Sequence, residues 1–347
     1  LVLVNSGTHT IELRGTNPLG TDNTAFIDDI KTTRIRDIAL SGFESPALPV
    51  SPGFAYAPAG GPWTFGGGSG LSRNGSGFTA SNPAAPEGNQ VMFLQGGSSA
   101  STTMTVQRAG YYRFKFKAAL RGANPTQPTA KNIRITVGGT PVGEFPLTST
   151  NYMEKISLAI FLNVGAQTVT LTGVDPLAGD HTGLVDDLRY EMLHDWQDPY
   201  VWGGVVPGPS DNAEVIAGSA VVMRGTINTK TVMVMGELLG AQNQNINATA
   251  NYFMVMGTGS LMELGQDLVP YPMAATITLN APVADIQVNV MGMGNKFLGA
   301  MGDATLHLHG ANKKSWTQLG ANVGPGSSTI TLKEAVDWQV NDSIVVV

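Results

Sequence analysis

The chain has no cysteine, so no disulfide bond holds its fold together. Secreted bacterial proteins lack disulfides more commonly than secreted animal domains do, and we therefore favour a bacterial source. Charged residues make up only 13% of the chain, and the net charge of −6 gives no basic footprint for nucleic acid. No run of about 18 apolar residues occurs, so the sequence predicts no membrane span.

Glycine and proline are abundant, with 43 and 20 residues in a chain of 347. This mixture argues against a helical bundle and predicts many short strands joined by turns. The length is enough for two or three domains. The chain starts at Leu1 without a signal peptide, and both ends fall inside apparent strands, so we expect it to be part of a longer protein.

An internal repeat divides the chain. Residues 7–30 align without a gap to residues 165–188, which lie 158 positions later. The identical pairs include Pro18 and Pro176, Leu19 and Leu177, Asp28 and Asp186, and Asp29 and Asp187. A period this long indicates a tandem domain rather than a solenoid. We therefore predict the end of one module at 1–36, a complete second module at 37–193, and a different domain at 194–347.

The complete module has the pattern of an antiparallel β-sandwich. Its segment 111–119 alternates, and this alternation predicts Tyr112, Phe114 and Phe116 on one face and Arg113, Lys115 and Lys117 on a polar outer face. At least seven short strands of this kind are expected. The module resembles the galactose-binding-like jelly-roll modules of secreted bacterial proteins, in the segments Gly42–Pro46, Trp63–Gly77, Val91–Gln95 and Leu184–Leu188.

This resemblance implies a structural Ca²⁺ ion. In such modules an aspartate of the closing strand and a glutamate near the start help to hold the ion, and hard oxygen ligands suit it. The corresponding residues are Glu44, Asp186 and Asp187, with Asp28 and Asp29 in the partial copy. Asp186 is in phase with apolar neighbours, so its carboxylate is expected to be buried and to need a partner. The alternative is that Asp186 caps backbone amides without a metal. No organic cofactor is expected.

The same module offers candidates for sugar binding, which requires an exposed aromatic platform and amide or acid groups beside it. We select Trp63, Tyr56 and Gln95, near the glycine-rich segment 66–77. The alternative is that the aromatic side chains fill the core of the sandwich.

The last part of the chain resembles the G-eight domain, a family named for its glycines. The resemblance begins at Trp202, and its most specific motifs are Leu308-His309-Gly310, Trp316–Leu319, Gly326–Leu332 and Val336–Ile344. Short strands are expected at 305–309, 328–332 and 344–347. Asn341 stands where the family usually has glycine. The resemblance implies a parallel, β-helix-like core. The predicted fold class is therefore all-β, with antiparallel jelly-roll sandwiches followed by a β-helix-like G-eight domain.

Four residues of this last domain are candidates for catalysis. His307 and His309 lie two apart on a strand and share a face, so they are a candidate metal pair or general acid. The alternative is a plain polar face. Asp337 and Asp342 are a candidate carboxylate pair for glycoside chemistry, or ordinary turn residues.

Methionine is also frequent in this last domain. Met233, Met235, Met254 and Met256 have strand spacing, and methionine fills irregular cores well. Copper binding is the alternative, which we disfavour because these residues fall on separate apolar strands.

The resemblances imply an extracellular or cell-surface protein that engages polysaccharide or a cell-surface glycan. Animal proteins with a G-eight domain include cell-surface hyaluronidases, so a glycan-depolymerising enzyme is one hypothesis. The other is a non-enzymatic adhesin, or a subunit that self-associates into an extracellular filament or sheath. We favour glycan binding or adhesion over catalysis, because fold analogy alone is weak ground for an activity.

Overall fold

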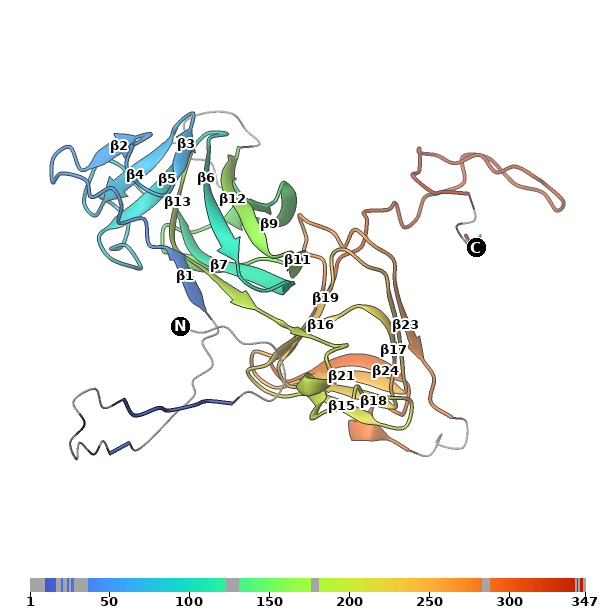
Figure 1. The fold of residues 1–347 in the computed structure, drawn as a ribbon. Helices are drawn as coiled ribbons and strands as arrows, with labels where there is room; N and C mark the ends of the chain where they lie inside the picture. Colours follow the sequence, from blue (N-terminus) through green and yellow to red (C-terminus); the bar gives the residue numbers. More distant parts are fainter. Residues whose placement is uncertain are drawn as a thin grey trace.

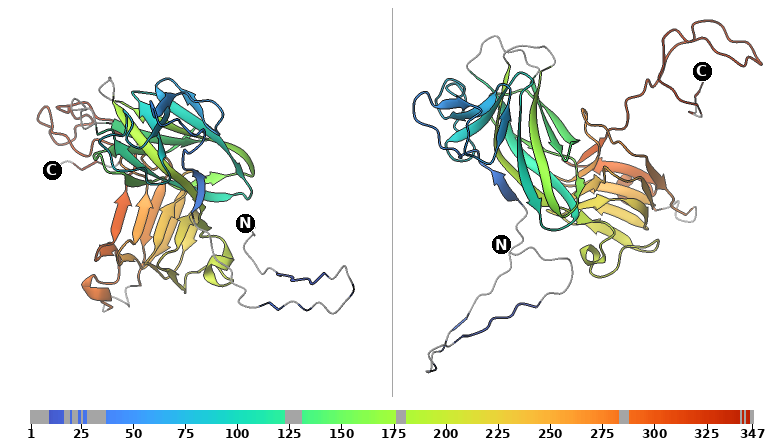
Figure 2. Two further views of the ribbon diagram at one scale, coloured as in Figure 1. Left: turned by 90° about the vertical axis from the view of Figure 1, so that its left-hand side faces the viewer. Right: turned by 45° about the horizontal axis from the view of Figure 1, so that its top comes forward.

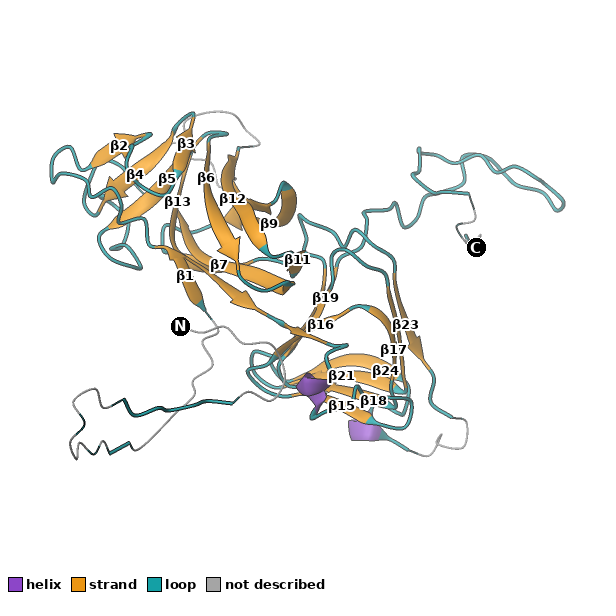
Figure 3. Ribbon diagram, in the orientation of Figure 1, coloured by secondary structure: helices purple, strands orange, loops and turns teal. Residues whose placement is uncertain are grey.

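The computed structural model describes residues 10–16, 20, 24, 26–27, 37–122, 131–175, 181–282, 288–340, 342 and 344–345. Within them the chain is built from strands, and the helical elements are the short 3-10 helices η1 (Pro199–Trp202) and η3 (Val290–Gly292) (Figure 3). The all-β prediction is confirmed. Most of the predicted first module at 1–36 lies outside the described residues, and so do Asp28, Asp29 and Asn341.

The strands form two units that lie side by side (Figures 1 and 2). The first unit, which we call the sandwich, has two sheets. The larger sheet contains eight strands, which are β1 (Ile38–Ser41), β2 (Phe54–Tyr56), β4 (Ser69–Arg73), β5 (Gln90–Gln95), β7 (Gly110–Leu120), β10 (Met153–Ile156), β11 (Ile160–Leu162) and β13 (Thr182–Met192). The smaller sheet contains five strands, which are β3 (Thr64–Gly66), β6 (Ser99–Val106), β8 (Lys131–Val137), β9 (Thr140–Leu147) and β12 (Gly165–Val174).

The sandwich is antiparallel, as its alternating pattern predicts. In the larger sheet β13 lies between β7 and β5, and in the smaller sheet β12 lies between β6 and β8. Tyr112, Phe114 and Phe116 of β7 pack in the core against apolar side chains of β12 such as Leu171. The sandwich is thus stabilised by burial of these inward faces.

The opposite face of β7 differs from its prediction. Arg113 was expected on a polar outer face, but it is only 3% exposed. Tyr111, on the same face, packs with Val222 and Leu239 of the second unit. The second unit therefore covers this end of β7. The alternating pattern within β7 cannot predict this contact, because its partners lie far away in sequence.

The second unit, which we call the coiled unit, consists of three parallel sheets. One contains β14 (His194–Asp195), β16 (Ala220–Met223), β19 (Glu237–Gly240), β22 (Leu261–Leu264) and β25 (Thr305–Leu308). The second contains β15 (Asn212–Val215), β18 (Thr231–Val234), β21 (Tyr252–Met256) and β24 (Phe297–Met301). The third contains β17 (Gly225–Asn228), β20 (Ile246–Ala250) and β23 (Ala275–Leu279).

Successive strands of the chain pass from sheet to sheet, so that each coil stacks on the previous one. The inward side chains, among them Val232, Phe253 and Leu238, form one core. Met223 and Met262 are fully buried in this core, where the flexible methionine side chain fills irregular space. This stacking of parallel coils is the expected β-helix-like arrangement.

The segment after β25 extends away from the coiled unit (Figure 1). The strand expected at 328–332 is absent there, and this described segment is joined by a single bridge between Leu319 and Leu332. The predicted strand was wrong because a strand needs a continuous ladder of partners, and its residues are mostly exposed here. In the part of the chain that the structure describes, there is no helix of the length and apolarity that crossing a membrane requires.

Candidate functional site

Two of the predicted sugar-binding residues meet at the edge of the larger sheet. Tyr56 ends β2 and is 46% exposed. Its hydroxyl donates to Gln95 Oε1 at the end of β5, over 2.9 Å. The strand between them contributes Gly70, which pairs with both Tyr56 and Phe93. A Cβ at Gly70 would lie 2.7 Å from the Phe93 ring, so glycine leaves room for that ring.

Phe93 and Phe78 form an aromatic cluster beneath Tyr56. Their rings stack at 4.1 Å, and the Tyr56 ring meets them edge-on at 5.0 and 5.9 Å. The Arg121 guanidinium lies 4.5 Å from the centre of the Phe78 ring. Our sequence interpretation missed Phe93 and Arg121, which stacking and pairing bring here. Tyr56 is thus the exposed edge of a rigid aromatic cluster.

Trp63 has a different position from the one predicted. Its side chain is only 4% exposed and packs 5.3 Å from the Phe43 ring. The indole N–H donates to Ser41 Oγ over 2.9 Å. Trp63 therefore lies in the sandwich core, where its ring is not presented to solvent.

The predicted calcium residues lie around the segment 87–90. Glu44 Oε1 accepts backbone N–H groups of Asn89 and Gln90, at 2.8 and 2.7 Å. Asp186 is fully buried, and its carboxylate accepts the N–H groups of Glu87 and Asp187 at 2.8 and 2.7 Å. Burial raises the pKa of Asp186 to about 7, although these two hydrogen bonds act in the opposite direction.

Glu87 is a third carboxylate in this region, and our sequence interpretation missed it. Side chains at Gly42 and Gly88 would collide with the carboxylates of Glu87 and Glu44, respectively, so both glycines make room for acidic groups. Asp187 instead bonds Arg189, whose Nε donates to Oδ1 over 2.5 Å. Within the described ranges, no group of three or more His, Asp or Glu side chains lies close enough together to hold a metal ion.

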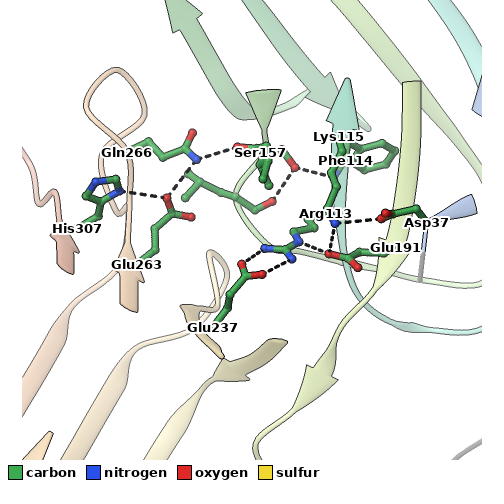
Figure 4. A network of polar contacts seen from close by, with 12 residues as sticks. Asp37, Arg113, Phe114, Lys115, Ser157, Glu191, Glu237, Glu263, Gln266 and His307 are labelled. Carbon is green, nitrogen blue, oxygen red and sulfur yellow. Dashed lines mark hydrogen bonds and ion pairs between the residues drawn. The ribbon is translucent and has the colours of Figure 1, made fainter. Parts of the chain in front are cut away.

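His307 and His309 of the coiled unit lie beside a buried carboxylate. Parallel pairing of β22 and β25 sets Glu263 opposite His307, and His307 Nδ1 lies 3.7 Å from Glu263 Oε1 (Figure 4). The rings of His307 and His309 are 5.7 Å apart. Burial raises the pKa of Glu263 to about 7. Gln266 Nε2 donates to Glu263 and to the carbonyl of Ile156 in the sandwich.

Arg113 joins the two units beside this cluster (Figure 4). It pairs with Glu191 of β13, and its Nη2 donates to Glu237 Oε1 of β19 over 2.8 Å. Lys115 extends the network, with Nζ 3.2 Å from Glu191 and 3.0 Å from Asp37. Burial alone would lower the pKa of Arg113, but the hydrogen bonds and charges of both glutamates outweigh it and raise the pKa.

The other pair of catalytic candidates lies in the extended C-terminal segment. Asp337 accepts the backbone N–H of Lys314 at 2.8 Å. Asp342 accepts the N–H of Gln339 at 2.7 Å and pairs with Lys313 at 2.6 Å. The Gln339 hydrogen bond and the Lys313 charge lower the pKa of Asp342. Asp342 thus serves a local turn through Gln339, whereas Asp337 connects two segments that are 23 residues apart.

Comparison with known proteins agrees with the coiled architecture. Residues 201–320 match the family model described as the G8 domain. The chain carries a G8 domain. It is 29% identical over 154 residues to mouse fibrocystin-L, a match that covers 44% of this chain and 4% of that protein. It is 33% identical over 111 residues to the zebrafish cell surface hyaluronidase, covering 30% of this chain and 8% of the relative. The chain thus spans a small part of the relatives it matches.

Among solved structures, the chain is similar to a carbohydrate-binding module, CBM36 in complex with calcium and xylotriose. The identity is 16% and the TM-score 0.27, over 37% of this chain and 92% of that module. The G8 domain itself includes Glu237, Glu263, His307 and His309, whereas Asp337 and Asp342 follow its last matched residue. The Arg113 network therefore joins the G8 domain to the sandwich.

Proposed function

We propose that this chain is part of an extracellular or cell-surface protein that binds polysaccharide through its sandwich. The observation that carries the proposal is Tyr56, a half-exposed ring held at the edge of an aromatic cluster and bonded to the amide of Gln95. A sugar ring presents an apolar C–H face that packs on an aromatic ring, and its hydroxyls exchange hydrogen bonds with an amide. A rigid platform also loses little entropy on binding.

The names of the relatives support the same location and class of ligand. One is a cell surface hyaluronidase, and this name connects the G8 domain with the cell surface and with a glycan. We propose binding without catalysis for this chain, because Asp337 and Asp342 both accept hydrogen bonds from backbone N–H groups. A bacterial source, adhesion and self-association into a filament stay predictions.

We also propose modules at 37–193 and 194–347, preceded by the end of another module at 1–36. The strands of the sandwich run from β1 to β13, and the coiled unit starts with β14 at His194, so the proposed boundary falls between them. The repeat of residues 7–30 at 165–188 supports a preceding sandwich of the same kind.

Tyr56→Ala is the direct test of the sugar site. We expect retention on a bound polysaccharide to weaken by about tenfold, because the substitution removes an anchoring ring. The measurement is affinity electrophoresis in gels that contain the polysaccharide. Tyr200→Ala is the matched control, since Tyr200 is 60% exposed and lies in η1, outside the sandwich. Equal weakening by both substitutions, or by neither, would count against Tyr56 as the platform.

We further propose that Glu44, Glu87 and Asp186 hold a structural Ca²⁺ ion. Hard carboxylate oxygens suit calcium, and a buried carboxylate needs a partner, which supports the proposal. In the described residues these side chains do not form a metal-binding group, and backbone N–H groups already donate to Asp186 and Glu44, as the metal-free alternative expects. Bound calcium would offset part of the negative charge of these three carboxylates and fix the segment 87–90. Asp187 is left out of this set because it pairs with Arg189, and Asp28 and Asp29 stay predictions for the partial copy.

Calcium is expected to stabilise the sandwich. At a hundredfold excess over the dissociation constant, the gain is about 2.7 kcal/mol, which raises Tm by roughly 5–10 °C. Calorimetry in calcium and in EDTA measures this shift in Tm. Asp186→Asn should abolish the shift. Asp175→Asn is the control and should leave it unchanged, because Asp175 pairs with His181 and is not in the proposed set. An unchanged Tm in EDTA would contradict the calcium proposal without touching the sugar site.

A further inference from the structure

The second sheet of the coiled unit carries an unusual outward face. Its strands alternate, so Val232, Phe253 and Leu298 point into the core. Met233, Met254 and Gly299 each directly follow one of these residues on its strand and therefore point outward. Strand pairing sets Met233 opposite Met254, and Met254 opposite Gly299. These three positions form one row across β18, β21 and β24, which we call the methionine row.

A third thioether completes this row. Gly299 has no side chain, and the Met293 sulfur lies 3.4 Å from the place its Cβ would occupy. Met254 is 0% exposed although it lies outside the core cluster, so neighbours cover it from the outer side. Met233 and Met293 are both half-buried. Met233, Met254 and Met293 therefore gather on one patch of the outer face.

The surroundings of the row are apolar on both sides. On one side the rings of Tyr252 and Phe297 stack in parallel at 4.9 Å. On the other side Met256 pairs with Met301. At the far end of the row, Glu214 of β15 lies opposite Met233 in the strand register and has an exposed side chain that ends in a carboxylate. The methionine row is thus flanked on one side by the stacked rings of Tyr252 and Phe297, and the negative charge of Glu214 lies at its end.

We propose that Met233, Met254 and Met293 bind a soft monovalent metal ion, Cu(I) or Ag(I). Thioethers select soft ions over the hard cations that carboxylates prefer. Neighbouring strands are about 4.8 Å apart, and the flexible methionine side chain lets three sulfurs converge on one ion. Glu214 compensates the charge that neutral sulfur ligands leave on the ion. Binding exchanges water for sulfur ligands and involves no change of oxidation state.

This proposal reverses an expectation from the sequence. Copper binding was disfavoured because the methionines fall on separate strands, but parallel pairing places those strands in register. A role as core filler accounts for Met223 and Met262, which are inside the coiled unit. It does not by itself account for Met233 and Met293, which lie half-buried on the outer face, where polar side chains are the usual choice.

The test is a titration of the whole chain with Ag(I), followed by ¹³C NMR of labelled methionine methyl groups. We expect the methyl signals of Met233, Met254 and Met293 to shift together and to saturate at one ion per chain. Met153, which is 52% exposed on the sandwich, is the internal control and should not shift. Shifts that follow exposure alone, with Met153 moving as much as the row, would overturn the proposal.

A variant with Met233→Leu, Met254→Leu and Met293→Leu keeps the size of the side chains and removes the sulfurs. We expect its affinity for Ag(I) to fall by more than about tenfold, whereas Met153→Leu leaves it unchanged. If the triple variant fails to fold, Met293→Leu alone is the substitute, because Met293 lies on a loop at the surface. Unchanged affinity in a folded variant would exclude the row as the site.

Discussion

Replacing Arg113 by alanine is expected to destabilise the chain by about 3–5 kcal/mol, the largest effect of any single substitution that we predict. The Arg113 side chain is 4% exposed and lies between Glu191, 5% exposed, and Glu237, 27% exposed. Removing the guanidinium leaves these two carboxylates without the cation that they share. Lys115 still reaches Glu191, but Glu237 loses its partner across the joint.

Thermal unfolding measures this prediction. Because Arg113 joins the sandwich to the G8 domain, we expect the variant to unfold in two separated transitions, at lower temperature than the unmodified chain. Arg134→Ala is the matched control, since Arg134 also pairs with a glutamate, Glu144, but its side chain is 42% exposed. A surface pair of this kind contributes less than about 1 kcal/mol. Equal losses in the two variants would show that the joint depends on other contacts.

Glu263→Gln is expected to stabilise the chain at pH 8 and to have no effect at pH 4.5. The pKa of Glu263 is raised from 4.5 to about 7 by burial, so the folded state holds this proton more tightly than the unfolded state does. The cost of ionising Glu263 is therefore absent below its unfolded pKa, develops as pH rises between about 4.5 and 7, and is complete above that range. Its upper bound is roughly 3 kcal/mol.

Burial, and not the charged groups around Glu263, sets the direction of this effect. Arg113 and His309 favour its ionised form and Glu237 opposes it, but burial outweighs them. Glutamine keeps an acceptor for Gln266 and carries no charge. Chemical denaturation at both pH values gives the two free energies, and Glu154→Gln at an exposed position of β10 is the control. A gain from Glu263→Gln that is the same at both pH values would contradict the raised pKa.

The sequence predicted those features that depend on local patterns. Alternation in β7 placed Phe114 and Phe116 in the core correctly, and the coiled G8 domain was expected from its motifs. Tyr56 and Gln95 were both selected as sugar ligands, and the structure brings them together. In the first two cases neighbouring residues carry the information, whereas Tyr56 and Gln95 are 39 residues apart and meet only because β4 pairs with both β2 and β5.

Features that depend on register or on packing between units were not predicted. Arg113 is buried because Glu237, 124 residues away in sequence, lies against it. Glu263 meets His307 only because β22 and β25 pair in parallel with that register. Trp63 was selected for exposure although its ring completes the core beside Phe43. A single chain contains no local signal for these contacts.

The most direct test of the proposed function is retention of the intact chain on a panel of acidic and neutral polysaccharides, with polysaccharide chain length followed in the same samples. Our account predicts retention on at least one polysaccharide without shortening of its chains, and loss of that retention in Tyr56→Ala. Shortened chains would show that the protein is an enzyme and would contradict binding without catalysis. No retention on any polysaccharide would contradict glycan binding itself and leave the non-enzymatic filament or sheath subunit as the better account.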